Sequence, residues 1–310
     1  MAEQGTQDTG NTMSRLSVAL VGAGRLASAL ARTVRGADVE FLGCHGRREA
    51  ATEALLELAG SGSALALEET AEADLVFLAV SDDVLSEVAA RIANTTTERA
   101  RVWLHGSGAL GPEVLGRLRS PRSGVGCLHP LASLPEGGDA TLEGCHMVLC
   151  GDEDARELAM DFAESLGGRP VWVAEMDRPL YHAACALLAN GTTALFSAGL
   201  ELLERASRSR LGRNAALGLV RSAFAPLESQ DPSLALTGPV RRGDAQTIER
   251  HRAALRRSHP AMLPLYDALM QVALSLAVDS GLDAPDAERI RDTLRSTGTA
   301  ESGNQGGEKP

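Results

Sequence analysis

The feature that most limits the fold is a short apolar run that stops at two glycines near the start of the chain. Residues 17–21 are compact and apolar, and Gly22-Ala23-Gly24 follows them directly. From Leu26 to Val34, apolar side chains recur at spacings of three and four, which is typical of an amphipathic helix. A strand, a Gly-x-Gly-x-x-Ala turn and a helix in this order predict the first unit of a dinucleotide-binding domain.

Each small residue of this turn has a physical role. Gly22 permits the tight turn, Gly24 lets the backbone approach a pyrophosphate, and Ala27 allows the helix to pack closely on the strand. The N-terminus of the helix adds free N–H groups and the positive end of its dipole. The residues predicted to contact the cofactor here are Gly22, Ala23, Gly24, Arg25 and Leu26.

The end of the next strand favours one nicotinamide cofactor over the other. An enzyme that binds NAD usually carries Asp or Glu at this position to hold the ribose hydroxyls. Here the strand at 39–44 runs into Gly46-Arg47-Arg48 without an acid, and Arg25 belongs to the glycine turn. The sequence therefore predicts NADP(H), with Arg47 or Arg48 paired with the 2′-phosphate. The alternative is that these arginines only form a solvated helix start.

Strands and helices alternate through the first half of the chain. Beyond the first two strands, apolar runs predict five more, at 74–80, 101–105, 124–129, 146–150 and 170–173. Helices are predicted at 49–59 and 84–92. This alternation favours parallel pairing through right-handed crossovers, and hence an α/β Rossmann domain with a doubly wound, mostly parallel sheet.

The periodicity changes near residue 175. From Pro179 to about Arg205 the pattern is helical throughout, with Asp177 placed to cap it. Further helices are predicted at 212–224, 244–257, 261–280 and 284–295. We expect the Rossmann domain at 15–175 and an all-α C-terminal domain, for substrate binding and dimerisation, at 176–295. Residues 1–14 and 296–310 have almost nothing to bury and are expected to be disordered tails.

Composition argues against several classes of function. The net charge of −11 repels phosphate backbones and anionic lipids, so neither nucleic acid nor a membrane is expected as a partner. The 30 basic residues comprise 29 arginines and one lysine, Lys309, which argues against any lysine-based mechanism. The five cysteines form no CxxC pair, and with no secretion signal evident we expect reduced thiols in a cytoplasmic protein. No metal is expected, because the spacing of the nearest candidates matches no zinc pattern; these are Cys127, His129, Cys145 and His146.

Three polar segments are predicted at the carboxyl ends of parallel strands, where ligands bind in open α/β sheets. Val80-Ser81-Asp82 closes the strand that begins at Asp74 and is expected to pass the nicotinamide ribose. His105–Gly108 and His129-Pro130-Leu131 follow the next two strands. His129 is the best candidate for acid–base chemistry, because imidazole titrates near neutrality and can exchange a proton with a carbonyl oxygen. The alternative is a structural histidine that caps the strand end.

These motifs together resemble those of a known family. The chain is similar to proteins that join a Rossmann-like domain to a C-terminal DUF2520 domain and are labelled NADP oxidoreductases. The resemblance spans roughly residues 16–290 and rests on five segments, which are Val21–Arg25, His105–Ala109, His129–Leu131, Tyr181–Ala184 and Leu236–Asp244. The family in turn resembles 6-phosphogluconate-dehydrogenase-like enzymes, which include prephenate dehydrogenases, pyrroline-5-carboxylate reductases and ketopantoate reductases.

The resemblance implies roles for four residues. Prephenate dehydrogenases carry a serine after one strand and a catalytic histidine before a proline after the next, and Ser107 and His129 occupy similar places. β-Hydroxyacid dehydrogenases use a lysine four residues before an asparagine on the interdomain helix. Asn190 is similar to that asparagine, but Ala186 stands where the lysine belongs, so that mechanism cannot operate. His182, eight residues before Asn190, is expected in the same cleft; the alternative is a buried helix histidine.

The segment Leu236–Asp244 is a turn with two adjacent arginines. Substrates of the related reductases are mostly carboxylates, which a guanidinium binds with two parallel hydrogen bonds. Arg241 is therefore the predicted substrate-binding residue. The alternative is that Arg241 and Arg242 are solvated, or pair with Asp244 or with a partner subunit.

We therefore expect an NADP(H)-dependent oxidoreductase that reduces a C=O or C=N bond of a small, carboxylate-bearing metabolite, or catalyses the reverse reaction. The substrate would be a ketopantoate-like keto acid or an imino acid, with His129 managing the proton and Ser107, His182 and Asn190 completing the catalytic set. Two alternatives remain, a non-enzymatic NADP-binding sensor and a structural dimer with a vestigial cofactor loop. The apolar circumference of residues 180–203 also predicts a homodimer formed through the C-terminal helices.

Overall fold

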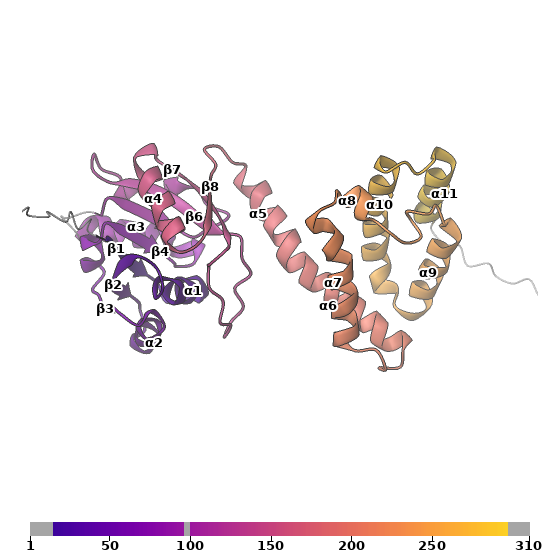
Figure 1. Cartoon of the computed structure of the whole chain (residues 1–310), viewed down its shortest axis with the longest axis horizontal. Coiled ribbons are helices and arrows are strands. Elements are labelled where there is room, and N and C mark those ends of the chain that lie inside the picture. The colour runs from indigo at the N-terminus through magenta and orange to yellow at the C-terminus, as the bar shows by residue number, and fades with distance from the viewer. Residues whose placement is uncertain (1–14, 96–99, 297–310) are drawn as a thin grey trace, which may run out of the picture. The chain divides into compact units, whose positions relative to one another are not determined.

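Two compact units make up the part of the chain that the structure describes. The computed structural model describes residues 15–95 and 100–296. The first unit ends at Gly191 and the second begins at Thr192 (Figure 1). The predicted tails lie outside the described residues, apart from Ser296.

One sheet of eight strands forms the centre of the first unit. The strands are β1 (Leu16–Val21), β2 (Val39–His45), β3 (Ser63–Ala64), β4 (Leu75–Leu78), β5 (Val102–His105), β6 (Gly124–Pro130), β7 (His146–Gly151) and β8 (Arg169–Trp172). Their order across the sheet is β3-β2-β1-β4-β5-β6-β7-β8. All neighbours pair in parallel except β6 and β7, which are antiparallel. The predicted fold class, a mostly parallel doubly wound sheet followed by a helical region, is confirmed.

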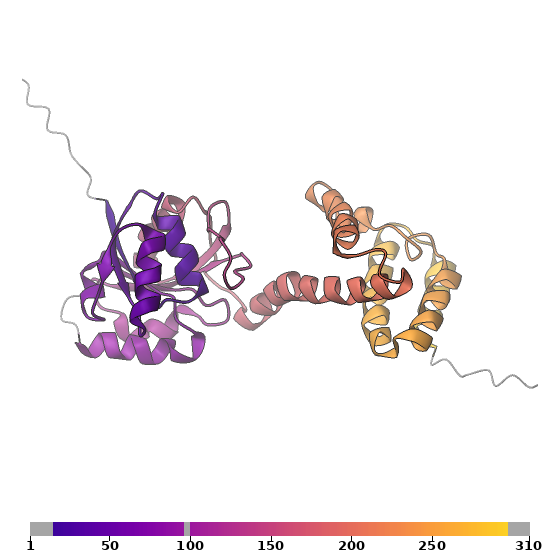
Figure 2. The same cartoon turned by 90° about the horizontal axis from the view of Figure 1, so that it is seen from below.

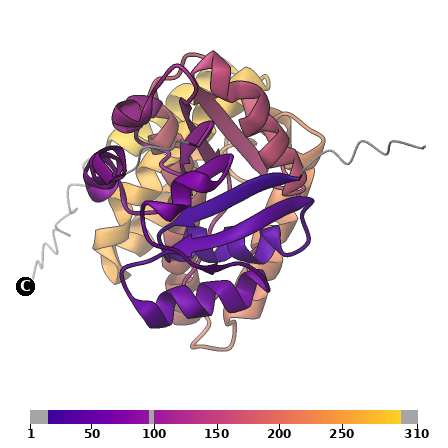
Figure 3. The same cartoon turned by 90° about the vertical axis from the view of Figure 1, so that its left-hand side faces the viewer.

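Helices lie on both sides of this sheet (Figure 3). One core joins the sheet to α1 (Arg25–Val34), α2 (Glu49–Ala59) and α4 (Glu153–Ser165), and a second core joins it to α3 (Leu85–Thr95) and the 3₁₀ helix η3 (Pro112–Leu118). β4 supplies both cores, with Leu75 and Phe77 in the first and Val76 and Leu78 in the second. A strand buried on both faces needs no polar alternation, which explains the unbroken apolar run in the sequence.

Two features of the sheet differ from what the sequence predicts. The two residues of β3, Ser63 and Ala64, are exposed, so no apolar run marks this strand. β7 runs antiparallel to β6, although the alternation of elements favours parallel pairing. The connection between them, residues 131–145, contains no helix, and a parallel return usually needs a crossover helix.

Helices account for almost all regular structure after β8. α5 (Arg178–Ala186), a π-helical turn (Leu187–Gly191) and α6 (Thr192–Ala206) follow one another without a break. The remaining α-helices are α7 (Arg213–Phe224), α8 (Pro232–Ala235), α9 (Ala245–Ser258), α10 (Leu263–Asp279) and α11 (Ala284–Arg295). Short 3₁₀ helices lie at η1 (Glu69–Glu72), η2 (Asp82–Val84), η5 (Ala225–Glu228) and η6 (Pro260–Met262). Where the sequence predicts a helix, its bounds agree with the structure to within three residues, whereas α4 and α8 are not among the predicted helices.

Three helices form the core of the second unit, and Figure 2 shows them side by side in orange and yellow. Ile248 of α9, Leu274 of α10 and Ile290 of α11 are buried together in one cluster. Arg252 of α9, 3% exposed, pairs with Asp267 of α10 through Nε and Oδ1 at 2.9 Å. A buried charge needs such a partner, so this ion pair fixes how α9 and α10 meet.

The boundary between the units lies at 191/192, later in the chain than the expected 175/176. Helix α5 belongs to the first unit because its side chains contact the strand ends, Tyr181 reaching His129 and Arg178 reaching Cys150. The change of periodicity in the sequence marks the end of the last strand. The first helix after it, α5, still contacts the sheet through its side chains and therefore belongs to the same unit.

The first helices of the second unit expose apolar side chains. α6 contains no buried residue, and Leu219 and Phe224 of α7 are 68% and 49% exposed. By length and composition alone, the helical stretches Arg178–Ala206 and Pro260–Asp279 could also cross a membrane.

Candidate functional site

The turn after β1 is closed by backbone contacts that only glycine permits. Gly22 has a φ of +111°, and a Cβ on this residue would lie 2.5 Å from the carbonyl oxygen of Ala79. Gly22 N donates to His45 O at 2.8 Å and Ala79 N donates to Val21 O at 2.7 Å, so the ends of β1, β2 and β4 are held together. Gly24 begins α1 without a side-chain cap, which leaves the first N–H groups of the helix to a ligand.

A cavity of about 320 Å³ opens beside this turn, within the size range of about 300–1,000 Å³ usual for small-molecule sites. Its wall includes seven of the residues predicted to bind the cofactor, which are Gly22, Ala23, Gly24, Arg47, Arg48, Val80 and Ser81. Arg91 of α3 also lines it and escaped the sequence analysis. The single carboxylate of the wall, Glu87, belongs to α3 and not to the end of β2.

The arginines of this cavity are available to an anion. Arg47, Arg48 and Arg91 are exposed, and none of them forms an ion pair with another part of the chain that the structure describes. Guanidinium groups bind phosphate oxygens with paired hydrogen bonds. The residues present therefore suit the adenosine 2′-phosphate end of NADP, in addition to its pyrophosphate.

Three predicted cofactor residues lie elsewhere. Arg25 lines a separate cavity of about 480 Å³, together with Arg32 and Arg48. Leu26 packs into the space that Gly106 leaves by having no side chain. Asp82 follows the cavity residue Ser81 but does not line the cavity. Its carboxylate accepts a hydrogen bond from the Ser107 hydroxyl. Their contact with a cofactor stays a prediction.

The loop after β5 is organised by a buried histidine. His105 is fully buried, its Nε2 lies 3.0 Å from Gly111 O, and its Nδ1 accepts a hydrogen bond from Ser107 N at 3.2 Å. The Ser107 hydroxyl donates to Asp82 Oδ2 at 2.8 Å and accepts from Ala109 N at 3.1 Å. Ser107 thus joins the loop after β5 to the segment after β4, and His105 sets the path of the loop.

His129 lies at the end of β6 and is oriented by a phenol. Its Nδ1 lies 2.7 Å from the hydroxyl of Tyr181, and the two rings meet edge to face. A Cβ on Gly108 would lie 2.8 Å from His129 Nε2 and 3.0 Å from His182 Nδ1, so both ring nitrogens approach the same glycine. The structure therefore brings together three of the predicted segments, through His129, His182 and the Gly108 loop.

The resemblance to prephenate dehydrogenases implies a histidine oriented near a serine, and the loop of Ser107 does approach His129 at Gly108, although no hydrogen bond joins the two side chains in the part of the chain that the structure describes. The hydroxyl of Ser107 bonds to Asp82 and to backbone N–H groups, whereas the partner of His129 is Tyr181. Sequence order placed Ser107 and His129 on neighbouring strands, but it could not supply the partner that α5 brings from 52 residues further along the chain.

Burial keeps the imidazole of His129 neutral. Desolvation lowers the pKa of His129 to about 4, and the neighbouring His182 and Arg178 lower it as well, against an opposite effect of Asp82. Burial raises the pKa of Tyr181 far above its ordinary value, so its hydroxyl keeps its proton. At neutral pH the pair is a neutral imidazole next to a neutral phenol, and each can donate or accept one proton.

Tyr181 and Arg178 are the functional residues of α5 that the sequence analysis did not assign. Arg178, Tyr181, His182 and Cys185 follow one another at spacings of three, one and three, which puts them on one face of a helix. Asp177 caps this helix by accepting a hydrogen bond from Leu180 N at 3.0 Å, as the sequence predicts. The pattern of polar residues at i, i+3 and i+4 was the signal that could have identified this face.

Asn190 and Arg241 are the two other predicted site residues. Asn190 lies in the π-helical turn and is exposed. Arg241 belongs to the second unit, where its guanidinium donates to Ser280 O at 3.1 Å, at the end of α10. That bond accounts for Arg241 structurally, and the substrate-binding roles of both residues stay predictions.

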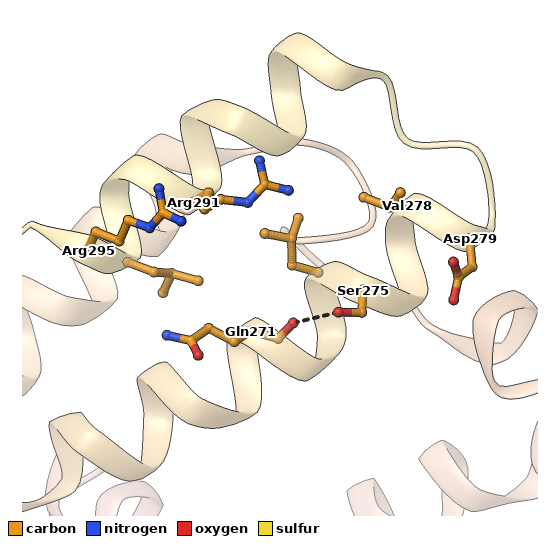
Figure 4. A pocket seen from close by; sticks show the side chains of 8 residues that line it. Gln271, Ser275, Val278, Asp279, Arg291 and Arg295 are labelled. Carbon is orange, nitrogen blue, oxygen red and sulfur yellow. Dashed lines mark hydrogen bonds between the residues drawn. The ribbon is translucent and has the colours of Figure 1, made fainter.

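A cavity of about 460 Å³ lies in the second unit, between α10 and α11 (Figure 4). Gln271, Ser275 and Asp279 come from α10, whereas Arg291 and Arg295 come from α11. The Arg291 guanidinium already pairs with Glu288 on its own helix. We assign no chemistry to this cavity.

Two family descriptions match the chain. Residues 2–135 match the Rossmann-like domain, and residues 145–273 match the domain of unknown function DUF2520. No curated protein matches the chain.

Several solved structures share the fold. A Bacteroides fragilis protein, provisionally named an NADP oxidoreductase, is 22% identical with a TM-score of 0.69 over 84% of this chain and 98% of that one. Pyrroline carboxylate reductase from Plasmodium falciparum, solved with NADP bound, is 13% identical with a TM-score of 0.56 over 86% and 99%. A variant of the imine reductase from Myxococcus stipitatus, in complex with NAD⁺, is 19% identical with a TM-score of 0.54 over 90% and 100%. At these identities the likeness shows the fold.

The buried histidine His105 predicts acid sensitivity. Burial lowers its pKa to about 4 in the folded protein, whereas an imidazole in an unfolded chain titrates near 6.5. Between these two pH values the unfolded chain binds more protons, so the free energy of unfolding falls as the pH falls, by roughly 3 kcal/mol for this group. Denaturant titrations at pH 7 and pH 4.5 measure the loss.

A pair of variants isolates the contribution of His105. His105→Gln is expected to lose clearly less stability between the two pH values than the parent, while His146→Gln, at an exposed site, behaves like the parent. If the free energy of unfolding fell equally in the parent and in His105→Gln, His105 would not be the cause of the acid sensitivity.

Proposed function

We propose that this chain, which matches a Rossmann-like domain over residues 2–135 and the DUF2520 domain over residues 145–273, is an oxidoreductase that uses NADP(H). The substrate we propose is a small metabolite with a C=O or C=N bond that carries a carboxylate. The observation that carries the proposal is the pair of sites at the carboxyl edge of one sheet, a cationic cavity beside the glycine turn and the His129–Tyr181 pair.

The choice of NADP(H) over NAD(H) rests on charge. Arg47 and Arg48 follow β2, where an enzyme for NAD usually carries an acid. Arg91 adds a third unpaired guanidinium to the same wall. Similar folds hold either cofactor, so the arginines of this chain and not the fold support the assignment.

The His129–Tyr181 pair supports proton transfer next to a hydride acceptor. A bound NADPH supplies the hydride. The Tyr181 hydroxyl can donate to Nδ1 of His129, which leaves the ring proton on Nε2, the nitrogen that approaches Gly108. As Nε2 gives its proton to the substrate oxygen or nitrogen, a proton from solvent replaces it, so the imidazole stays neutral and Tyr181, whose pKa is raised by burial, keeps its own proton. Gly108 leaves the space that this transfer needs.

An enzyme fits the site better than a cofactor sensor does. A sensor needs only the cavity beside the glycine turn and has no use for a desolvated histidine held by a phenol. Groups with shifted pKa values gather at functional sites, and His129 is one of them. The third alternative, a structural dimer with a vestigial turn, does not explain why the cavity is lined by arginines that have no acidic partner.

A homodimer through the C-terminal helices is proposed for the exposed apolar surface. The apolar side chains of α6 and α7 include Leu195, Leu219 and Phe224, which are 44–68% exposed. The net charge of −11 disfavours an anionic lipid surface as the partner. A second copy of the chain offers the same apolar helices, and a symmetric interface is self-complementary.

Cofactor preference is the first prediction of this proposal. NADPH is expected to bind at least about tenfold more tightly than NADH, because a charged hydrogen bond to phosphate contributes about 1.5–3 kcal/mol. Replacing Arg47 and Arg48 together by serine should remove this preference and leave NADH affinity unchanged, as fluorescence titration can show. Arg101→Ser, at a site outside this cavity, is the control. Equal affinities of the parent for NADPH and NADH would refute the assignment.

Turnover is the second prediction, measured as NADPH consumption with a panel of keto acids and cyclic imines. His129→Asn should lower kcat by about 10²–10⁴-fold and leave NADPH affinity nearly unchanged. Tyr181→Phe, which removes only the hydroxyl, should cause a smaller loss of about tenfold. The acid limb of kcat/KM should lie near pH 4, the pKa of His129, and not near 6.5. Activity within a few-fold of the parent in folded His129→Asn would move the proton to another group.

Assembly is the third prediction. Light scattering at micromolar protein concentration should report a dimer, and Leu219→Glu should convert it to a monomer because the charge would be buried in the interface. Arg242→Glu, at an exposed polar site, should leave the dimer intact. A monomeric parent, or a parent that sediments with neutral lipid vesicles, would contradict the proposed interface.

A further inference from the structure

Two cysteines face each other across the antiparallel pair of strands. Cys127 of β6 is directly opposite Cys150 of β7, and the two side chains are 0% and 5% exposed. Asp152 N donates to Val125 O at 2.9 Å and Leu131 N donates to His146 O at 2.8 Å, so alternate pairs of this ladder are hydrogen-bonded pairs. Cys127 and Cys150 form a pair of the same type, for which the Cα atoms are about 5.5 Å apart. Disulfides span Cα separations of about 4.4–6.8 Å, so the separation typical of this pair lies within the range that a disulfide bridges.

A guanidinium lies against both sulfur atoms. Arg178, the first residue of α5, donates through Nη1 to Cys127 Sγ at 3.5 Å and through Nη2 to Cys150 Sγ. Arg178 forms no ion pair with a carboxylate of the described residues. The hydrogen bond with the Cys127 thiol lowers the pKa of Cys150, and Arg178 lowers it as well, against burial. A guanidinium that has no carboxylate partner and touches two sulfurs stabilises a thiolate.

The thiol pair is separate from the proton-transfer pair but touches the same segments. Cys127 Sγ lies 3.1 Å from Ser107 O, in the loop that passes His129 at Gly108. Arg178 stands one helical turn before Tyr181, the partner of His129. The proposed oxidoreductase chemistry uses neither cysteine.

We propose that Cys127 and Cys150 are a redox-sensitive site that hydrogen peroxide converts to a disulfide, with Cys150 as the attacking thiolate and Arg178 as the residue that activates it. The Cys150 sulfur attacks one oxygen of the peroxide, the O–O bond breaks, and the second oxygen leaves as water after it takes up a proton. The sulfenic acid formed on Cys150 is attacked by the sulfur of Cys127, the S–S bond forms, and the S–O bond breaks with loss of a second water. Two thiols are oxidised by two electrons and one peroxide is reduced to two waters.

Oxidation changes both contacts that connect this pair to its surroundings. A disulfide has no thiol proton to donate to Ser107 O and no thiolate charge to hold Arg178. The loop at Gly108 and the start of α5 therefore lose a contact together, whereas the cavity beside the glycine turn has none with either cysteine. Peroxide should consequently lower turnover and leave NADPH affinity unchanged, and a reducing dithiol should restore turnover.

Thiol counting and peptide mapping on the full chain test the proposal without any substrate. Peroxide should remove two thiols from the parent and link the peptides of Cys127 and Cys150, with the loss of two hydrogens in mass, and dithiothreitol should reverse both changes. Cys145→Ser, which removes the half-buried cysteine just before β7, should behave like the parent. In Cys127→Ser the link cannot form, and a sulfenic-acid trap should label Cys150.

The role of Arg178 is tested by rate. Arg178→Met should slow the loss of the two thiols at pH 7 by about tenfold, because less of the Cys150 thiolate is present, and Arg178→Lys should recover part of the rate. The proposal is overturned if peroxide consumes Cys145 and Cys185 in the parent while Cys127 and Cys150 stay unlinked. It is also overturned if the link forms equally fast in folded Arg178→Met, since the activation would then not come from the guanidinium.

Discussion

The turn at Gly22 is the constraint on which the rest of the site depends. The positive φ of this residue and the close approach of Ala79 O leave no room for a Cβ, so the end of β1 lies directly against the end of β4. Because β1, β4, β5 and β6 are parallel neighbours, closing this corner aligns the loops that follow all four strands at one edge of the sheet. The glycine turn, the Ser107 loop and His129 lie at this edge as a result.

The two ends of this edge differ in charge: one carries arginines, and the other carries neutral imidazoles. The cavity beside the glycine turn exposes arginines without acidic partners. In the neighbouring loops His105 is buried and His129 is half-buried, and desolvation lowers the pKa of each to about 4. An anionic cofactor is therefore attracted to one end of the edge, and a neutral proton donor is available at the other. Asp82 and Ser107 connect these two ends by a hydrogen bond of 2.8 Å.

Much of this could be predicted from local sequence patterns. The order strand, glycine turn, helix, the buried runs at 74–80 and 101–105 and the helical periodicity after residue 178 all depend on residues close in the chain. The direction of β7 could not be predicted, because it depends on whether the connection from β6 contains a crossover helix. The partner of His129 was equally out of reach, since Tyr181 comes from 52 residues away and a hydroxyl on a helix face has many structural uses. The cysteine pair depends on that same strand direction, which only the fold supplies.

The most direct test of the account is a crystal structure of the protein with NADP⁺ bound. The account predicts the pyrophosphate at the N–H groups of Gly24 and the start of α1, the 2′-phosphate within hydrogen-bond distance of Arg47 or Arg48, and the nicotinamide ring on the side of the edge where His129 lies. A 2′-phosphate that points into solvent, with the arginines unengaged, would contradict the cofactor assignment. A nicotinamide directed away from His129 would contradict the proposed proton transfer.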